Sequence, residues 1–189
     1  CEHRPCFEAA VARFREAPFE APAPPRGSSA HESGFRVCIR KRPFFQHEAE
    51  QGEFDVLSCL PERIVVHDAR MHPDMRNMFM NHHDFSFDEV FGETVDNEAV
   101  YQDTACELVD TVADGGQATI MMYGQTGSGK TFTMSALHKR VAEDLFDRLA
   151  KYAAPESTQR PPTVTMYFIE LLGDSCFDML NGGAPCNLV

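Results

Sequence analysis

The first half of the chain contains short stretches in which hydrophobic and polar positions alternate. Residues 35–39 place phenylalanine, valine and isoleucine at every second position, and Pro43 follows shortly after. This pattern predicts a half-buried strand that ends before the proline. Short apolar runs at residues 64–66 and 85–87 predict two further strands.

Between these two strands lies an insert, residues 67–84, that is rich in methionine and histidine. It is too polar for a core, so we expect a solvated loop. A metal site is the alternative interpretation of its histidines, but adjacent side chains such as His82 and His83 cannot easily converge with distant loop residues. The histidines of the insert are His67, His72, His82 and His83.

Two segments of the second half have apolar residues at helical spacing. Residues 94–113 repeat apolar positions every three or four residues, and the glycine pair 115–116 supplies a stop signal. Residues 134–149 carry a similar stripe, whose ordinary explanation is core packing. The members of this stripe are Met134, Leu137, Val141, Leu145 and Leu149.

Apolar runs at residues 118–123 and 163–172 predict two buried strands, and a short helical segment is expected at 175–181. Strands therefore alternate with helices along the chain. This order predicts an α/β sandwich with a ligand site at the carboxyl ends of the strands.

Residues 1–34 differ in character from the rest of the chain. They are rich in proline and small polar residues, which predicts a largely flexible linker, and only residues 5–17 have helical spacing. We expect the folded domain to comprise residues 35–189. Because the chain begins at Cys1 and not at methionine, it resembles a piece of a longer protein.

Composition limits the classes of partner. A chain of 189 residues with 43% hydrophobic and 24% charged residues is typical of one soluble globular domain. Its apolar runs are shorter than the roughly 18 residues that a membrane span requires, and its net charge of −12 disfavours nucleic acid. Neither a membrane nor a nucleic acid is expected as a partner. Seven scattered cysteines without a C-x-x-C pair indicate reduced thiols in a cytosolic protein.

The segment "MMYGQTGSGKTFTM", residues 121–134, contains the pattern G-x-x-x-x-G-K-[ST]. Its glycines would let successive backbone N–H groups turn toward one anion, assisted by the positive end of the following helix. Lys130 would reach the β- and γ-phosphates, and Thr131 would place its hydroxyl on a magnesium ion. A flexible Gly/Ser turn is the alternative. The predicted cradle consists of Gly124, Gln125, Thr126, Gly127, Ser128, Gly129, Lys130 and Thr131.

Five segments together resemble the kinesin motor domain in order and spacing, from about Phe35 to the end of the chain. They are "FRVCIRKRP" (35–43), "FSFDEVF" (85–91), "NEAVYQ" (97–102), "YGQTGSGKTFTM" (123–134) and "FIELLGDSCFDMLN" (168–181). The resemblance implies part of a P-loop NTPase three-layer sandwich. It also implies binding of ATP or ADP with magnesium, tubulin or microtubules as the partner, and a place in the cytoplasm on the microtubule cytoskeleton, the spindle included.

The resemblance assigns further residues to the adenine. Arg40 and Pro43 would clamp the faces of the base, and Tyr101 would stack or pack beside them. A planar guanidinium is chemically suited to this task. Lys41 and Arg42 are weaker candidates, which hold the strand end or form a basic patch. The R-K-R-P segment and the long insert are similar to the internal-motor, microtubule-depolymerising kinesins, although the Lys-Val-Asp loop tip of that subfamily is absent.

The chain also departs from the family pattern. The switch segments N-x-x-S-S-R-S-H and D-L-A-G-x-E do not occur in residues 1–189, so no catalytic residue is assigned, and Glu170 receives no catalytic role. The usual glycine and loop after Thr133-Met134 are missing as well, which implies either two fused helices or a lost segment.

Three functions remain open. The first is an ATP-dependent microtubule motor, the second a nucleotide-binding pseudo-motor that acts as an interaction module without hydrolysis, and the third a small-molecule kinase. The kinase is disfavoured because the sequence shows neither a substrate lid nor a second catalytic signature.

Overall fold

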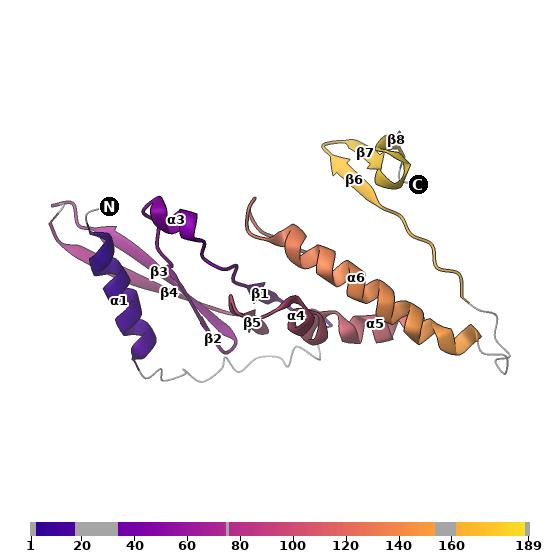
Figure 1. Cartoon of the computed structure of the whole chain (residues 1–189), viewed down its shortest axis with the longest axis horizontal. Helices are drawn as coiled ribbons and strands as arrows, with labels where there is room; N and C mark the ends of the chain where they lie inside the picture. Colours follow the sequence, from indigo (N-terminus) through magenta and orange to yellow (C-terminus); the bar gives the residue numbers. More distant parts are fainter. Residues whose placement is uncertain (1–2, 18–33, 75, 154–161, 188–189) are drawn as a thin grey trace. The chain divides into compact units, whose positions relative to one another are not determined.

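The computed structural model describes residues 3–17, 34–74, 76–153 and 162–187 (Figure 1). The chain divides into two compact units, Cys1–Asp144 and Leu145–Val189. Helices and strands are mixed, in agreement with the α/β class. Among the described residues the strands form three separate small sheets, so the predicted three-layer sandwich stays a prediction.

The largest sheet of the first unit is antiparallel, in the order β2-β3-β4. Its strands are β2 (Leu57–Leu60), β3 (Arg63–Met71) and β4 (Met78–Ser86). The nine-residue strands β3 and β4 pair along their whole length, from Arg63 opposite Ser86 to Met71 opposite Met78. The expectation of a solvated loop over residues 67–84 was therefore wrong.

The polar residues of this hairpin do not prevent strand formation because the sheet and a helix give them partners. His67 is only 1% exposed. Its Nε2 lies 2.8 Å from Ser58 Oγ, and its Nδ1 lies 2.8 Å from Nδ1 of His82 on the neighbouring strand. A buried polar ring is tolerated where its nitrogens are hydrogen-bonded.

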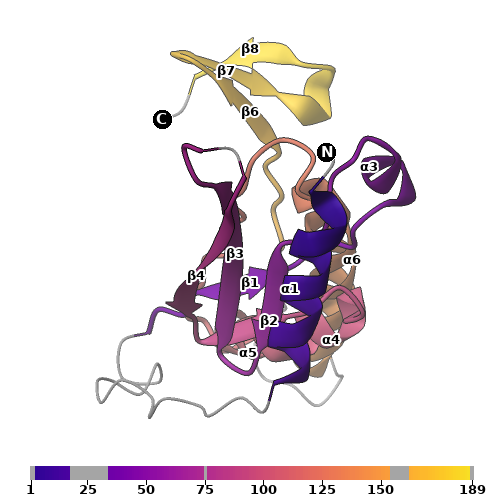
Figure 2. The same cartoon turned by 90° about the vertical axis from the view of Figure 1, so that its left-hand side faces the viewer.

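Helix α1 (Arg4–Glu16) covers one face of this sheet, as Figures 1 and 2 show. Phe7 and Val11 are buried, and the Phe14 ring packs against His67 and His82, with centroid distances of 4.7 and 4.6 Å. Arg15 donates to Ser58 Oγ at 3.0 Å. The helical spacing predicted for residues 5–17 is confirmed, and this helix packs on the sheet. The division into a linker, residues 1–34, and a folded domain from residue 35 stays a prediction. Residues 18–33 lie outside the described residues.

We expect His67 to remain neutral down to about pH 4. Burial, followed by the neighbouring His82, lowers its pKa from 6.5 to about 4. Arg15 and Lys41 act in the same direction, whereas Asp55 opposes them. In the unfolded chain the ring takes up a proton near pH 6.5, which the folded chain does not bind, so stability falls as the pH is lowered from about 6.5 toward about 4.

Histidine ring-proton NMR measures this pKa directly. The His67 resonance is identified as the one that disappears in a His67→Gln variant. A His67 resonance that titrates near pH 6.5 would contradict the prediction.

The first unit also contains a short parallel pair of strands, the helices α3, α4 and α5, and most of the helix α6. Strand β1 (Cys38–Arg40) pairs with β5 (Glu89–Phe91), with Arg40 opposite Phe91. Helix α3 (Gln46–Glu50) follows β1. The predicted helix over residues 94–113 is two helices, α4 (Asn97–Thr104) and α5 (Cys106–Ala113), separated at the buried Ala105.

Helix α6 (Lys130–Leu149) is a single helix of 20 residues. The helix runs without a break through the position where the family pattern has a glycine and a loop, and both explanations for the missing loop stay predictions. Its residue Leu137 is buried, as the apolar stripe predicts. The other buried hydrophobic residues of the helical part are Val100, Tyr101, Ala105, Val109 and Ala113.

The second unit contains a small antiparallel sheet in the order β6-β7-β8. Its strands are β6 (Ile169–Leu172), β7 (Ser175–Asp178) and β8 (Ala184–Cys186). The 3-10 helix η1 (Ala150–Ala153) precedes β6 in the sequence, and η2 (Met179–Asn181) lies between β7 and β8. The strand predicted at 163–172 is thus only four residues long and exposed on all of them. The helix predicted at 175–181 was wrong, because most of that segment pairs as β7 with both neighbouring strands.

The buried strand predicted at residues 118–123 was also wrong. This segment has no regular secondary structure, and Met121 and Tyr123 are 85% and 98% exposed. A strand requires a neighbour to complete its backbone hydrogen bonds, and no sheet of the described residues includes this segment.

Candidate nucleotide-binding site

The loop between residues 124 and 129 depends on glycine for its shape. Gly124, Gly127 and Gly129 have φ values of 153°, 83° and 93°, a region that side-chain-bearing residues rarely adopt. A Cβ atom on Gly124 would lie 2.7 Å from Ser128 Oγ. The backbone conformation therefore favours glycine at position 124, whereas rotation of the Ser128 side chain would relieve the short contact.

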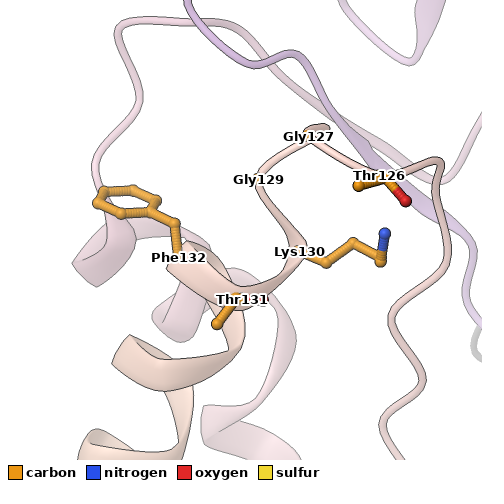
Figure 3. Close-up of a pocket in the computed structure, with 6 residues that line it drawn as sticks. All are labelled: Thr126, Gly127, Gly129, Lys130, Thr131 and Phe132. Atoms are coloured by element: carbon orange, nitrogen blue, oxygen red, sulfur yellow. The ribbon is translucent and has the colours of Figure 1, made fainter.

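The Lys130 side chain is hydrogen-bonded to the first residues of the loop. Its ammonium group donates to the carbonyl oxygens of Gly124 at 2.6 Å and Gln125 at 2.9 Å. Figure 3 shows the lysine side chain extended toward the side of the loop that carries Thr126, whereas the Thr131 side chain points the other way. The Ser128 N–H donates to Gln125 O at 3.1 Å and so tightens the turn.

A pocket of about 330 Å³ lies over the loop and the first turn of α6. Cβ atoms added at Gly127 or Gly129 would meet nothing within 4 Å, so the space beside these glycines is open. Because α6 begins at Lys130, the positive end of its dipole and a lysine cation lie at the same place. This arrangement fits a polyphosphate. The lining residues are Thr126, Gly127, Gly129, Lys130, Thr131 and Phe132.

The structure brings Arg40 to the first turn of α6. Its guanidinium donates to Thr133 Oγ1 and Val95 O, each at 2.8 Å, and to Asn97 Oδ1. It also lies 5.7 Å from the centroid of the Phe132 ring. Burial lowers the pKa of Arg40, and the Asp96 carboxylate acts in the opposite direction. Arg40 thus connects β1 by hydrogen bonds to α4 and to α6.

Pro43 and Tyr101 are the other two residues predicted to contact the adenine. Pro43 is exposed. Tyr101 is 0% exposed, and its hydroxyl donates to Asp144 Oδ2 at 2.6 Å, while the Arg140 guanidinium lies 5.0 Å from the ring centroid. As placed, the Tyr101 ring offers no surface to a base, because it fills the space between α4 and α6. Its predicted contact with adenine stays a prediction.

The neighbouring basic residues hold the strand end, as one of the sequence interpretations proposes. Lys41 is buried and forms ion pairs with Asp55 at 2.7 Å and Glu93 at 3.0 Å. Arg42 pairs with Glu48 and lies 4.7 Å from the Phe45 ring centroid.

Sequence reasoning did not identify Asn97 and Thr133 as the hydrogen-bond partners of Arg40. Thr133 lies three residues after Lys130 and so returns to the same side of the helix, a spacing that offered a signal. Asn97 stands at the start of α4, where the Asp96 side chain accepts from the Ala99 N–H. Its proximity to Arg40 depends on the tertiary fold and had no local signal.

A glycine-rich loop followed by a lysine at the first residue of a helix is the phosphate-binding loop of the P-loop nucleotide-binding class. Within that class the family can be identified from sequence. The family model of the kinesin motor domain matches residues 40–188. The chain belongs to the kinesin motor domain family.

Individual relatives agree with this assignment. Diatom spindle kinesin-1 of Cylindrotheca fusiformis is 33% identical over 168 residues, which cover 88% of this chain and 26% of that protein. The kinesin-like proteins KIF24 of Mus musculus and Homo sapiens are 37% and 35% identical over 153 residues, or 77% of this chain. The chain spans about a quarter of the diatom protein and 11% of each KIF24.

In the part of the chain that the structure describes, every helix is too short or too polar to cross a lipid bilayer.

Proposed function

We propose that this chain is the ATP-binding part of a microtubule motor that couples ATP hydrolysis to movement along microtubules or to their depolymerisation. The observation that carries the proposal is the loop closed by Lys130, whose ammonium contacts two loop carbonyls beside an open pocket. Membership of the kinesin family supports ATP as the nucleotide and microtubules as the partner. The place of action is the cytoplasm and its microtubules, with the spindle as one site.

The residues of this chain bind and orient the nucleotide. Lys130 would transfer its hydrogen bonds from the two loop carbonyls to phosphate oxygens, while the glycine-rich backbone from Gly124 to Gly129 surrounds the anion. Thr131, exposed on the first turn of α6, would hold Mg²⁺. The metal supplies neutralisation of phosphate charge when bound.

Arg40 and Pro43 are the proposed contacts of the adenine. Arg40 stands next to the first turn of α6, so a base that lies over Phe132 and Arg40 would continue from phosphates held by the loop. Arginine is suited to this contact because its planar cation stacks on aromatic rings.

The Arg40→Ala variant should distinguish base recognition from phosphate recognition. We expect about tenfold weaker binding of Mg-ADP and nearly unchanged binding of inorganic triphosphate, because triphosphate has no base and the hydrogen-bond partners of Arg40 lie outside the phosphate loop. Isothermal titration calorimetry measures both affinities. Arg36→Ala is the matched control, since Arg36 is exposed and donates to Asp103 O. Equal weakening of both ligands would show that Arg40 acts only by holding α6.

Phosphate release tests the division between binding and hydrolysis. We expect residues 1–189 to bind nucleotide but to show no microtubule-stimulated turnover, because the groups that hold the attacking water in kinesins belong to the two switch segments absent from this sequence. The measurement is steady-state phosphate release with and without microtubules. Stimulation that disappears in Lys130→Ala would show that this chain carries its own catalytic groups.

A further inference from the structure

Two cysteines of the second unit stand directly opposite each other on neighbouring strands. Cys176 of β7 and Cys186 of β8 are partners in the antiparallel register, and their sulfur atoms are 3.3 Å apart. Both side chains are half-buried and reduced. We propose that Cys176 and Cys186 are a thiol-oxidation site, which forms a reversible disulfide in exchange with a low-molecular-weight disulfide such as oxidised glutathione.

The backbone already has the geometry that a disulfide requires. Directly opposed residues of antiparallel strands have Cα atoms about 4.5 to 5.5 Å apart, and disulfides span Cα separations of about 4.4 to 6.8 Å. The two sulfur atoms would approach from 3.3 Å to about 2.05 Å, a change that side-chain rotation supplies. By contrast, Cys38 and Cys59 lie on strands of two different sheets in the other unit.

The contact between the thiols also indicates the order of the chemical steps. The Cys186 thiol donates to the Cys176 sulfur, and this hydrogen bond, with burial, raises the pKa of Cys186. The raised pKa of Cys186 keeps its thiol protonated. We therefore assign the first attack to Cys176 and the resolution of the mixed disulfide to Cys186.

The exchange balances in two steps. The Cys176 thiolate attacks one sulfur of oxidised glutathione, which forms a protein–glutathione disulfide and releases one glutathione thiolate. The Cys186 sulfur, after losing its proton, attacks the Cys176 sulfur and releases the second glutathione. Two protein thiols are oxidised, one glutathione disulfide is reduced to two glutathione thiols, and the two protons pass to the released thiolates.

The bridge would act on a sheet with little stability of its own. The strands β6, β7 and β8 have four, four and three residues, and β6 is exposed along its length. The turn between the cysteines contains Gly182 and Gly183, with φ values of 64° and 78°, which makes the reduced segment costly to order. A cross-link that closes this turn restricts the unfolded chain and so favours the paired strands.

Peptide mapping of the full 189-residue chain tests the proposal. The chain is incubated with reduced and oxidised glutathione, free thiols are blocked with N-ethylmaleimide, and the protein is digested with a protease that cleaves before aspartate. Asp178 lies between the two cysteines, so their peptides stay joined only where the disulfide has formed. We expect a joined pair that dithiothreitol separates, that Cys186→Ser removes and that the control Cys38→Ser retains.

The rate of bridging separates native geometry from chance pairing. In the native chain the joined peptides should appear about tenfold faster than in urea, because the folded strands hold the sulfur atoms together. Equal rates in urea and buffer would overturn the proposal. So would a native chain in which Cys176 and Cys186 each carry a separate glutathione, or pair mainly with Cys38 or Cys59. Because the rate comparison uses the unmodified chain, it remains valid if a serine variant does not fold.

Discussion

Replacement of Lys130 by alanine is expected to weaken binding of Mg-ATP and Mg-ADP by about 100-fold. Charge-assisted hydrogen bonds to phosphate contribute about 1.5 to 3 kcal/mol each, and the variant loses the one cation that lines the pocket in the described structure. It also loses the two contacts that hold the loop, from Lys130 Nζ to the carbonyls of Gly124 and Gln125. The loss of affinity should therefore combine weaker attraction with a less ordered loop.

Lys139→Ala provides the matched control for this measurement. Lys139 lies on the same helix and carries the same charge, but it is exposed, and its ion pair is a 4.0 Å contact with Glu143. Isothermal titration calorimetry should find its affinity close to that of the parent chain. If Lys130→Ala also binds with parental affinity, the assignment of the phosphate loop is wrong.

Tyr101→Ala is expected to lower the free energy of unfolding by about 3 to 5 kcal/mol. Truncation of a fully buried aromatic side chain leaves a cavity at this cost, and Tyr101 is fully buried between α4 and α6. The variant also removes the hydroxyl that donates to Asp144 and the ring against which Arg140 lies. Urea unfolding followed by circular dichroism measures the change.

Tyr123→Ala removes the same side chain from a position where it is 98% exposed. We expect its unfolding free energy to stay within about 0.5 kcal/mol of the parent value. If Tyr101→Ala were as mild as this control, Tyr101 would not be a core residue in solution, and its predicted place beside adenine would regain support.

The features that sequence predicted well are those set by local chemistry. The phosphate loop needs glycines at fixed positions because its backbone adopts positive φ, and these requirements are visible in the sequence itself. Helix α6 could also be predicted from the sequence, since its apolar stripe repeats with the helical period and includes the buried Leu137. The family assignment followed from several such segments in a fixed order.

The features that sequence missed depend on contacts between distant residues. The insert at 67–84 looked too polar for a core and was expected to be a solvated loop, yet strand pairing provides the buried His67 with Ser58 and His82 as partners. Conversely, the apolar run at 118–123 had the composition of a buried strand but finds no neighbouring strand among the described residues. Whether either segment pairs as a strand could not be deduced from its own residues.

The uninterrupted course of α6 sets the distance between its two ends. At about 1.5 Å per residue, its 20 residues form a rod of about 30 Å, with Lys130 at one end and the boundary between the two units, after Asp144, toward the other. A tilt of about 5° at the Lys130 end would carry the Leu149 end through about 3 Å.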